Sequence, residues 1–164
     1  CVVCMHEEAT QARPAWTQKV VNAAVRGAIY ASENKTEVAY MLSRDGAGYL
    51  PAPAAVGERA MTTYDAPDYR ESGAVQHASE WENGRIDFQP WPYPSATRLM
   101  VEAMRDTVVA GDTAFLAGLD SQFEADALVA YTFVRQALDQ NPAWLNDPSV
   151  NPGDPFNREE ILRL

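Results

Sequence analysis

The amino-acid sequence opens with one strand-like segment and then continues almost entirely in helical patterns. Residues 1–5 form an unbroken apolar run that includes Val2 and Val3, a pattern typical of a strand buried on both faces. A lone strand cannot satisfy its own backbone donors and acceptors. We therefore predict an α/β fold class in which the chain is a helix-rich, incomplete domain, with one or two strands completing a sheet formed elsewhere.

Several later segments place apolar residues at the three- and four-residue spacing of an amphipathic helix. The clearest covers residues 15–33, where Trp16, Val20 and Val25 belong to the apolar face. We predict further helices at residues 35–44, 54–64, 95–108 and 123–138. Ser95 and Ser121 are the residues that we expect to cap the last two.

Two stretches have no helical period. Residues 65–94 are rich in proline, glycine and aromatic residues, and a stretch this long is seldom a passive connection in a compact domain, so we predict an ordered loop. Residues 141–164 contain Trp144 and several prolines. We predict an extended tail there, ending in a helical turn at residues 158–164.

The charge balance argues against two kinds of partner. The sequence has 23 acidic and 13 basic residues, which gives a formal net charge of −10. Nucleic-acid binding needs clustered Lys and Arg to displace counterions from phosphates, so we expect no nucleic-acid partner. An anionic membrane surface is disfavoured by the same repulsion.

No pattern typical of a catalytic or cofactor site is present: the sequence lacks a P-loop, a dinucleotide-binding turn, a nucleophile elbow and an H-E-x-x-H helix. Cys1 and Cys4 form a C-x-x-C, but positions three apart on a strand point to opposite faces. We interpret them as buried cysteines and expect no metal and no cofactor. The chain is therefore predicted not to be an enzyme. The alternative is an enzyme that uses Glu80 or Glu82 as a general acid or base.

The candidate ligand-binding residues are His6, Arg85, Trp91 and Tyr93. His6 follows the predicted strand, and ligands of open α/β folds bind beyond the carboxyl ends of strands. An arginine among aromatic side chains suits a small anion, because it supplies fixed charge and paired donors in a site poor in water. The alternative is that His6 lies in a solvated turn and that the aromatic residues only pin the loop, with Arg85 paired to a carboxylate.

The order of these segments resembles the C-terminal portion of solute-binding proteins of ABC importers, in the nitrate- and bicarbonate-binding family of type II periplasmic binding proteins. The resemblance rests on the strand-like residues 2–5 with residues 8–14 leading into the long helix, on residues 88–94 and on residues 151–155. It implies a two-lobed fold of which this chain forms the last part. The family's main ligand contacts lie upstream of the matched region, so no binding motif is carried over.

The resemblance implies capture of a small oxyanion such as nitrate, nitrite or bicarbonate. The implied partners are an N-terminal lobe of the same protein and an ABC permease in the membrane, and the implied location is periplasmic or membrane-tethered and extracytoplasmic. One alternative is a cytoplasmic anion sensor of the same fold that regulates a partner protein. Another is a free-standing helical interaction module.

Overall fold

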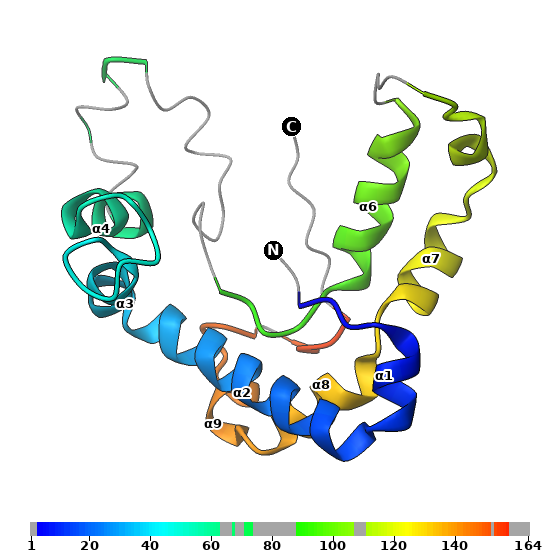
Figure 1. Ribbon diagram of the computed structural model, residues 1–164, viewed down its shortest axis with the longest axis horizontal. Coiled ribbons are helices and arrows are strands. Elements are labelled where there is room, and N and C mark those ends of the chain that lie inside the picture. Colours follow the sequence, from blue (N-terminus) through cyan, green and yellow to red (C-terminus); the bar gives the residue numbers. More distant parts are fainter. Residues whose placement is uncertain are drawn as a thin grey trace. The chain divides into compact units, whose positions relative to one another are not determined.

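The computed structural model of the chain describes residues 3–62, 67, 71–73, 88–106, 111–151 and 153–157. The chain divides into two compact units. The first comprises Cys1–Arg26 and Pro90–Leu162, and the second comprises Gly27–Gln89 and Arg163–Leu164. The secondary structure of the described residues is helical in both units (Figure 1).

The predicted strand is wrong, and with it the α/β fold class. The described part of the chain contains no strand, and the residues from Val3 to His6 have no regular structure. Val3 is 65% exposed and Cys4 is an exposed free thiol, so the interpretation of Cys4 as a buried cysteine is also wrong. Within the described ranges, residues 3–5 have no neighbouring strand with which to share backbone hydrogen bonds, and without one an extended segment forms no ladder.

The long helix is confirmed. A short helix, α1 (Glu7–Ala12), is followed by α2 (Pro14–Glu33), and Pro14 occupies the helix start, where its missing N–H has no intrahelical partner to lose. Val25 is buried as expected, but Trp16 is 47% exposed and its neighbour Thr17 is 2% exposed. The buried side of α2 therefore lies along Thr17, Val21 and Val25, and Trp16 lies outside it.

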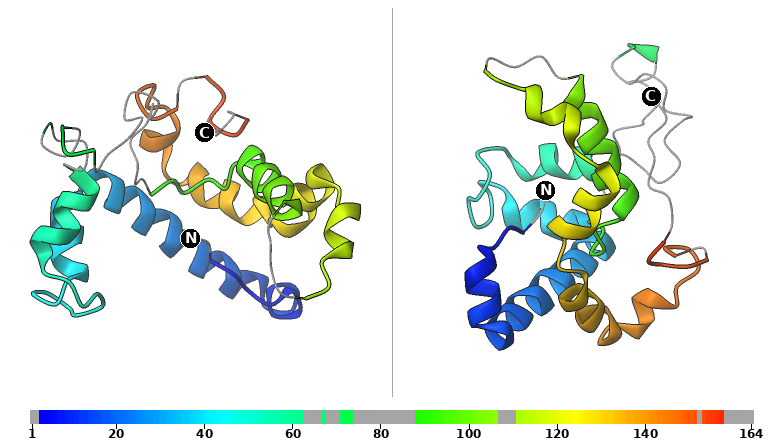
Figure 2. Two further views of the ribbon diagram at one scale, coloured as in Figure 1. Left: turned by 90° about the horizontal axis from the view of Figure 1, so that it is seen from above. Right: turned by 90° about the vertical axis from the view of Figure 1, so that its right-hand side faces the viewer.

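The rest of the first unit is a series of short helices. They are α6 (Pro94–Arg105), the 3-10 helix η2 (Ala114–Gly118), α7 (Ser121–Leu128), α8 (Tyr131–Asp139) and α9 (Pro142–Leu145). α6 packs against α7 and η2 (Figure 2), and α8 packs against α9. α2 is joined to α8 by a hydrogen bond from Gln18 Nε2 to the Phe133 carbonyl oxygen, 2.8 Å long.

The second unit is built on a pair of helices, α3 (Lys35–Leu42) and α4 (Ala54–Thr62), which pack against each other and confirm the helices predicted there. The loop between them folds back on the end of α3. Arg44 N donates to the Ala52 carbonyl oxygen, Leu50 N donates to that of Leu42, and Asp45 Oδ2 accepts from Ala54 N. These bonds replace the helical ones that the chain loses between the two helices.

Most of the predicted loop at residues 65–94 lies outside the described residues, and so does the predicted final turn at 158–164. The tail from residue 141 is more folded than predicted, because α9 opens it and buries Trp144 to 7% exposure. Asn151 Nδ2 then donates to the Trp144 carbonyl oxygen. None of the helices described is both long and apolar enough to cross a membrane.

Candidate functional site

Aromatic and charged side chains of the first unit gather around Trp91. Its ring is 3% exposed, and its indole N–H donates to the Phe156 carbonyl oxygen at 3.0 Å. The Trp91 ring lies 4.7 Å from the Phe156 ring, edge to face, and 5.1 Å from the Tyr131 ring. Contacts of this kind are favourable beyond the area that they bury. Together they attach the tail and α8 to the segment that leads into α6.

A guanidinium group lies against these rings. The Arg135 Cζ is 4.2 Å from the centre of the Phe156 ring and 5.2 Å from that of Trp91, within the range of a cation–π contact. An arginine guanidinium is planar, and its N–H groups can pair with a planar acceptor. We call Trp91, Tyr131, Arg135 and Phe156 the Trp91 cluster.

An acidic group also belongs to this neighbourhood. Asp154 accepts hydrogen bonds from Phe156 N at 2.9 Å and from Asn157 Nδ2 at 2.6 Å. These bonds hold the pKa of the Asp154 carboxyl below its ordinary value, and the positive charge of Arg135 adds to the effect. An anion that approached Arg135 would therefore meet a carboxylate nearby.

Tyr131 is fixed to the neighbouring helix as well as to Trp91. Its hydroxyl donates to the Ala125 carbonyl oxygen at 3.1 Å. Burial raises the pKa of this hydroxyl first, the negative charge of Asp126 raises it further, and Arg98 offsets part of the rise. The raised pKa keeps the Tyr131 hydroxyl protonated at neutral pH, which suits its role as a hydrogen-bond donor to Ala125.

The four residues predicted to bind ligand have different surroundings. Trp91 and Tyr93 are both buried, at 3% and 4% exposure. His6 lies just before α1 and is exposed, and its carbonyl oxygen accepts from Thr10 N and Thr10 Oγ1. Arg85 lies outside the described residues, as do Glu80 and Glu82. The structure thus places Trp91 and Tyr93 on one buried segment, and the role of all four as ligand contacts stays a prediction.

Sequence reasoning missed Tyr131, Arg135 and Phe156. Tyr131 and Arg135 are four residues apart, so they share one face of α8, and this spacing is visible in the sequence. Nothing in the sequence links that face to Trp91, forty positions upstream, or to Phe156. The pairing depends on how the chain folds back, which no local pattern specifies.

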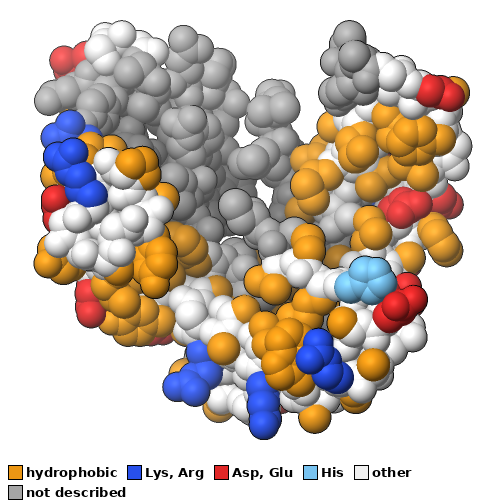
Figure 3. All heavy atoms as spheres, viewed as in Figure 1, with side chains coloured by type: hydrophobic (Ala, Val, Ile, Leu, Met, Phe, Trp, Pro, Cys, Tyr) orange, Lys and Arg blue, Asp and Glu red, His pale blue; other side chains and the backbone are white. Residues whose placement is uncertain are grey.

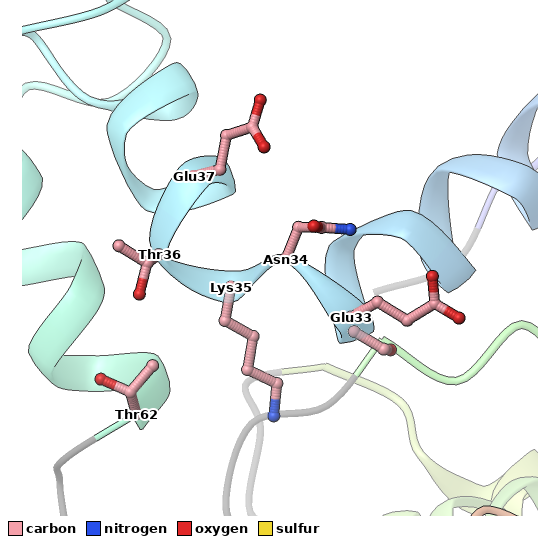
Figure 4. Close-up of a pocket in the computed structure, with 7 residues that line it drawn as sticks. Glu33, Asn34, Lys35, Thr36, Glu37 and Thr62 are labelled. Carbon is pink, nitrogen blue, oxygen red and sulfur yellow. The ribbon is translucent and has the colours of Figure 1, made fainter.

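The second unit has an open pocket of about 510 Å³ between the end of α2 and the start of α3, near the end of α4. Its lining is polar: Ser32, Glu33, Asn34, Lys35, Thr36, Glu37 and Thr62. Figure 4 shows Thr36 turned toward Thr62 and Glu37 directed away from it, and Thr36 Oγ1 donates to Glu58 Oε1 at 3.0 Å. Glu33 and Glu37 beside Lys35 make this pocket a poor place for an anion.

No protein-family model, curated protein or solved structure matches the chain. Among the described residues there is also no group of three or more His, Cys, Asp or Glu side chains that could hold a metal ion.

Proposed function

We propose that the chain belongs to the solute-binding component of an ABC importer and takes part in capturing a small oxyanion such as nitrate, nitrite or bicarbonate. The component acts outside the cytoplasm, together with an N-terminal lobe of the same protein, and delivers the anion to a permease in the membrane. Binding and release suffice for this function, and no bond is made or broken.

One observation carries the proposal. Residues 88–94 and 151–155, two of the segments on which the family resemblance rests, are far apart in the sequence. In the structure Trp91 of the first segment packs against Phe156, which directly follows the second. A residue of the first segment thus contacts the residue next to the second, and this contact between two segments that resemble the family supports the proposal.

Two arginines are candidates for the anion contact. Arg85 is the candidate from the sequence, because it lies in the aromatic loop. Arg135 is the candidate from the structure, because its guanidinium lies against the Trp91 and Phe156 rings and its side chain is exposed; the nearby Asp154 carboxylate weakens the binding of an anion there. Either one supplies the fixed charge and paired donors that a planar oxyanion needs.

Calorimetric titration of the full-length protein with nitrate, nitrite and bicarbonate tests the proposal, with chloride as the control anion. We expect saturable binding of at least one oxyanion and little or none of chloride. One of the two variants Arg85→Gln and Arg135→Gln should weaken oxyanion binding by about tenfold or more, which corresponds to the loss of one charged hydrogen-bonded contact. The variant that does so identifies the arginine that contacts the anion.

The matched control is Arg26→Gln, which removes the same charge from an exposed site on α2. It should leave the affinity unchanged, and thermal unfolding of each variant should show that the fold is kept. Absence of binding heat with all three oxyanions would overturn the proposal. Equal weakening by all three substitutions would mean that only net charge matters, and this too would count against a specific site.

A further inference from the structure

Part of the chain around α2 carries basic charge alone. Residues 9–32 contain no acidic side chain, although the whole sequence has 23 acidic residues. The charged residues in this stretch are Arg13, Lys19 and Arg26, and all three are exposed. The acidic residues nearest along the chain lie just beyond the two ends of the stretch. A helix of an otherwise acidic chain therefore presents a basic surface over most of its length.

Two of these basic residues lie on the outward side of α2. That side is formed by four exposed residues at successive intervals of three, four and three: Trp16, Lys19, Ala23 and Arg26. On the opposite side Thr17 and Val25 are buried. The Arg13 guanidinium lies over the Trp16 ring, 4.7 Å from its centre, and adds a third positive charge. We call Arg13 and the four residues of this side the α2 stripe. Figure 3 shows Lys and Arg side chains spaced along α2 with hydrophobic side chains between them.

The basic groups of the α2 stripe have no acidic partner within the described part of the chain. The ion pair found there joins Arg44 to Asp45 in the second unit. In the same described ranges the Lys19 and Arg26 side chains also make no hydrogen bond, whereas the two arginines of α6 both donate to neighbouring segments. An acidic group brought by a partner therefore gains the attraction of these charges without displacing an existing contact.

The spacing of the α2 stripe suits a second helix. Residues at alternating intervals of three and four form the seam along which two helices pack. Lys19 and Arg26 are seven residues apart, about 10 Å along the helix axis, so acidic residues seven apart on a neighbouring helix would face both. Ala23 lies between them, and its small side chain lets a neighbouring helix approach. The Trp16 ring, which is 47% exposed, offers apolar area at the end of the seam.

We propose that the α2 stripe is the docking site for an acidic helix of a partner protein. Glu or Asp side chains of that helix pair with Lys19 and Arg26, and an apolar side chain packs over Ala23 against Trp16. The net charge of −10 does not prevent this contact. Charges farther away than about 8 Å are largely screened at physiological ionic strength, and a helix is only about 10 Å wide.

Larger anionic surfaces fit the α2 stripe less well. A nucleic-acid duplex or an anionic membrane extends past both ends of the stripe, where Glu8 and Glu33 lie, and meets the acidic remainder of the chain. The inference does not rest on the oxyanion proposal, because no residue of the stripe belongs to the Trp91 cluster.

Fluorescence anisotropy tests the docking site with the whole chain and a labelled helical peptide that has glutamates seven residues apart beside a stripe of leucine and alanine. No oxyanion is present in this assay. We expect saturable binding that weakens as salt is added. A peptide of the same composition, scrambled so that its glutamates no longer share one side, should bind at least about threefold more weakly.

Two variants of the chain separate the contributions of charge and apolar contact. Lys19→Gln/Arg26→Gln should lose about threefold to tenfold in affinity for the acidic helical peptide, the usual contribution of two exposed ion pairs. Trp16→Ala, which leaves the charge unchanged, should lose about fivefold or more, because it removes the apolar area of the seam.

The matched control is Arg44→Gln/Arg59→Gln, which removes two exposed positive charges from the second unit. It should bind the peptide as the wild type does, and thermal unfolding should show that every variant keeps the fold. The proposal is overturned if the two peptides bind equally, if Lys19→Gln/Arg26→Gln keeps the wild-type affinity, or if the control loses as much. It is equally overturned if a DNA duplex or anionic vesicles bind more tightly than the peptide through Lys19 and Arg26, or if light scattering shows that a second copy occupies the stripe.

Discussion

At the scale of single residues, Gly46 has the closest neighbours for an added side chain among the glycines that the structure describes. A Cβ added there would lie 2.2 Å from the Tyr40 carbonyl oxygen and 3.1 Å from that of Met41. Both contacts are with backbone atoms, which cannot move without distorting the end of α3. We predict that Gly46→Ala lowers the free energy of unfolding by about 1–3 kcal/mol, as measured by urea denaturation.

Gly57 on α4 provides the control for Gly46. A Cβ at Gly57 would lie 3.4 Å from Ala39 Cβ, at the edge of ordinary contact. Alanine also favours a helix over glycine by up to about 1 kcal/mol, so Gly57→Ala should be neutral or slightly stabilising. If Gly46→Ala proved as stable as Gly57→Ala, the close approach of the loop to Tyr40 would be refuted.

Two neighbouring residues, Asp120 and Ser121, are candidates for the N-terminal cap of α7. The sequence predicts Ser121, but in the structure Asp120 Oδ1 accepts from Gln122 N and Phe123 N, both at 2.9 Å, and Ser121 Oγ donates to Glu102 instead. We predict that Asp120→Ala costs about 0.5–2 kcal/mol of stability, the usual loss for a removed cap. Ser121→Ala should cost less, because it removes an exposed side-chain bond. The midpoints of urea denaturation of the two variants measure these losses. A lower midpoint for Ser121→Ala than for Asp120→Ala would identify Ser121 as the cap.

At the scale of elements, the sequence predicted the helices whose signal is local. The spacing of apolar residues identified α2, α3, α4 and α6 nearly to their ends, because this spacing reflects one buried side of each helix. The prediction of a strand failed for residues 3–5, the described part of the apolar run, since an apolar run alone does not say whether a partner strand exists.

The sequence also missed the break between α7 and α8, which it read as one helix. Val129 and Ala130 are neither glycine nor proline and give no signal of a break. The break depends on Tyr131, whose hydroxyl bonds to the Ala125 carbonyl oxygen and whose ring contacts Trp91. These are contacts between segments, and they override local propensity.

The candidate site was predictable only where its sequence signal is local. The aromatic character of residues 88–94 singled out Trp91 and Tyr93, and burial of both shows that they are structurally important. Arg135 and Phe156 could not be assigned to the same place, because each lies in a segment whose sequence gives no sign of the other. The sequence therefore identified the segment, and only the fold identified its neighbours.

The turn that carries Asp154 leads to a prediction on pH. Hydrogen bonds from Phe156 N and Asn157 Nδ2 lower the pKa of Asp154 below the ordinary value of 3.8, so the folded state favours the ionised form. This contribution to stability is present above the pKa of the unfolded state and is lost as the pH falls through the lower pKa of the folded state. We predict that Asp154→Asn lowers the thermal midpoint at neutral pH, and that the difference from wild type shrinks below about pH 4.

The control for Asp154 is Asn157→Ala, which removes one of the two donors without changing the charge. Asn157→Ala should lower the thermal midpoint at neutral pH by less than Asp154→Asn does, and this difference from wild type should also shrink at low pH. A difference between Asp154→Asn and wild type that stays constant down to pH 2 would show that the hydrogen bonds of this carboxylate do not depend on its ionisation.

At the scale of the whole molecule, the net charge of −10 and the exposed apolar side chains of α6 have opposite effects on self-association. Repulsion between acidic chains opposes association at neutral pH, while burial of Leu99, Met100 and Met104 favours it. The free energy of association therefore depends on pH, because protonation of carboxylates removes the repulsion and leaves the contribution of apolar burial unchanged.

We therefore predict that the chain is monomeric at pH 7 and low salt, and that it associates as the pH approaches its isoelectric point of about 4.5. Sedimentation velocity across this range measures the change. Met100→Gln/Met104→Gln should shift the onset of association to lower pH or higher protein concentration, because it weakens the apolar term and keeps the charge. Met41→Gln should have a smaller effect, since it removes a single exposed methionine, which belongs to α3 and not to α6. A stable dimer at pH 7, or association that is insensitive to Met100 and Met104, would show that another surface dominates the behaviour of the molecule in solution.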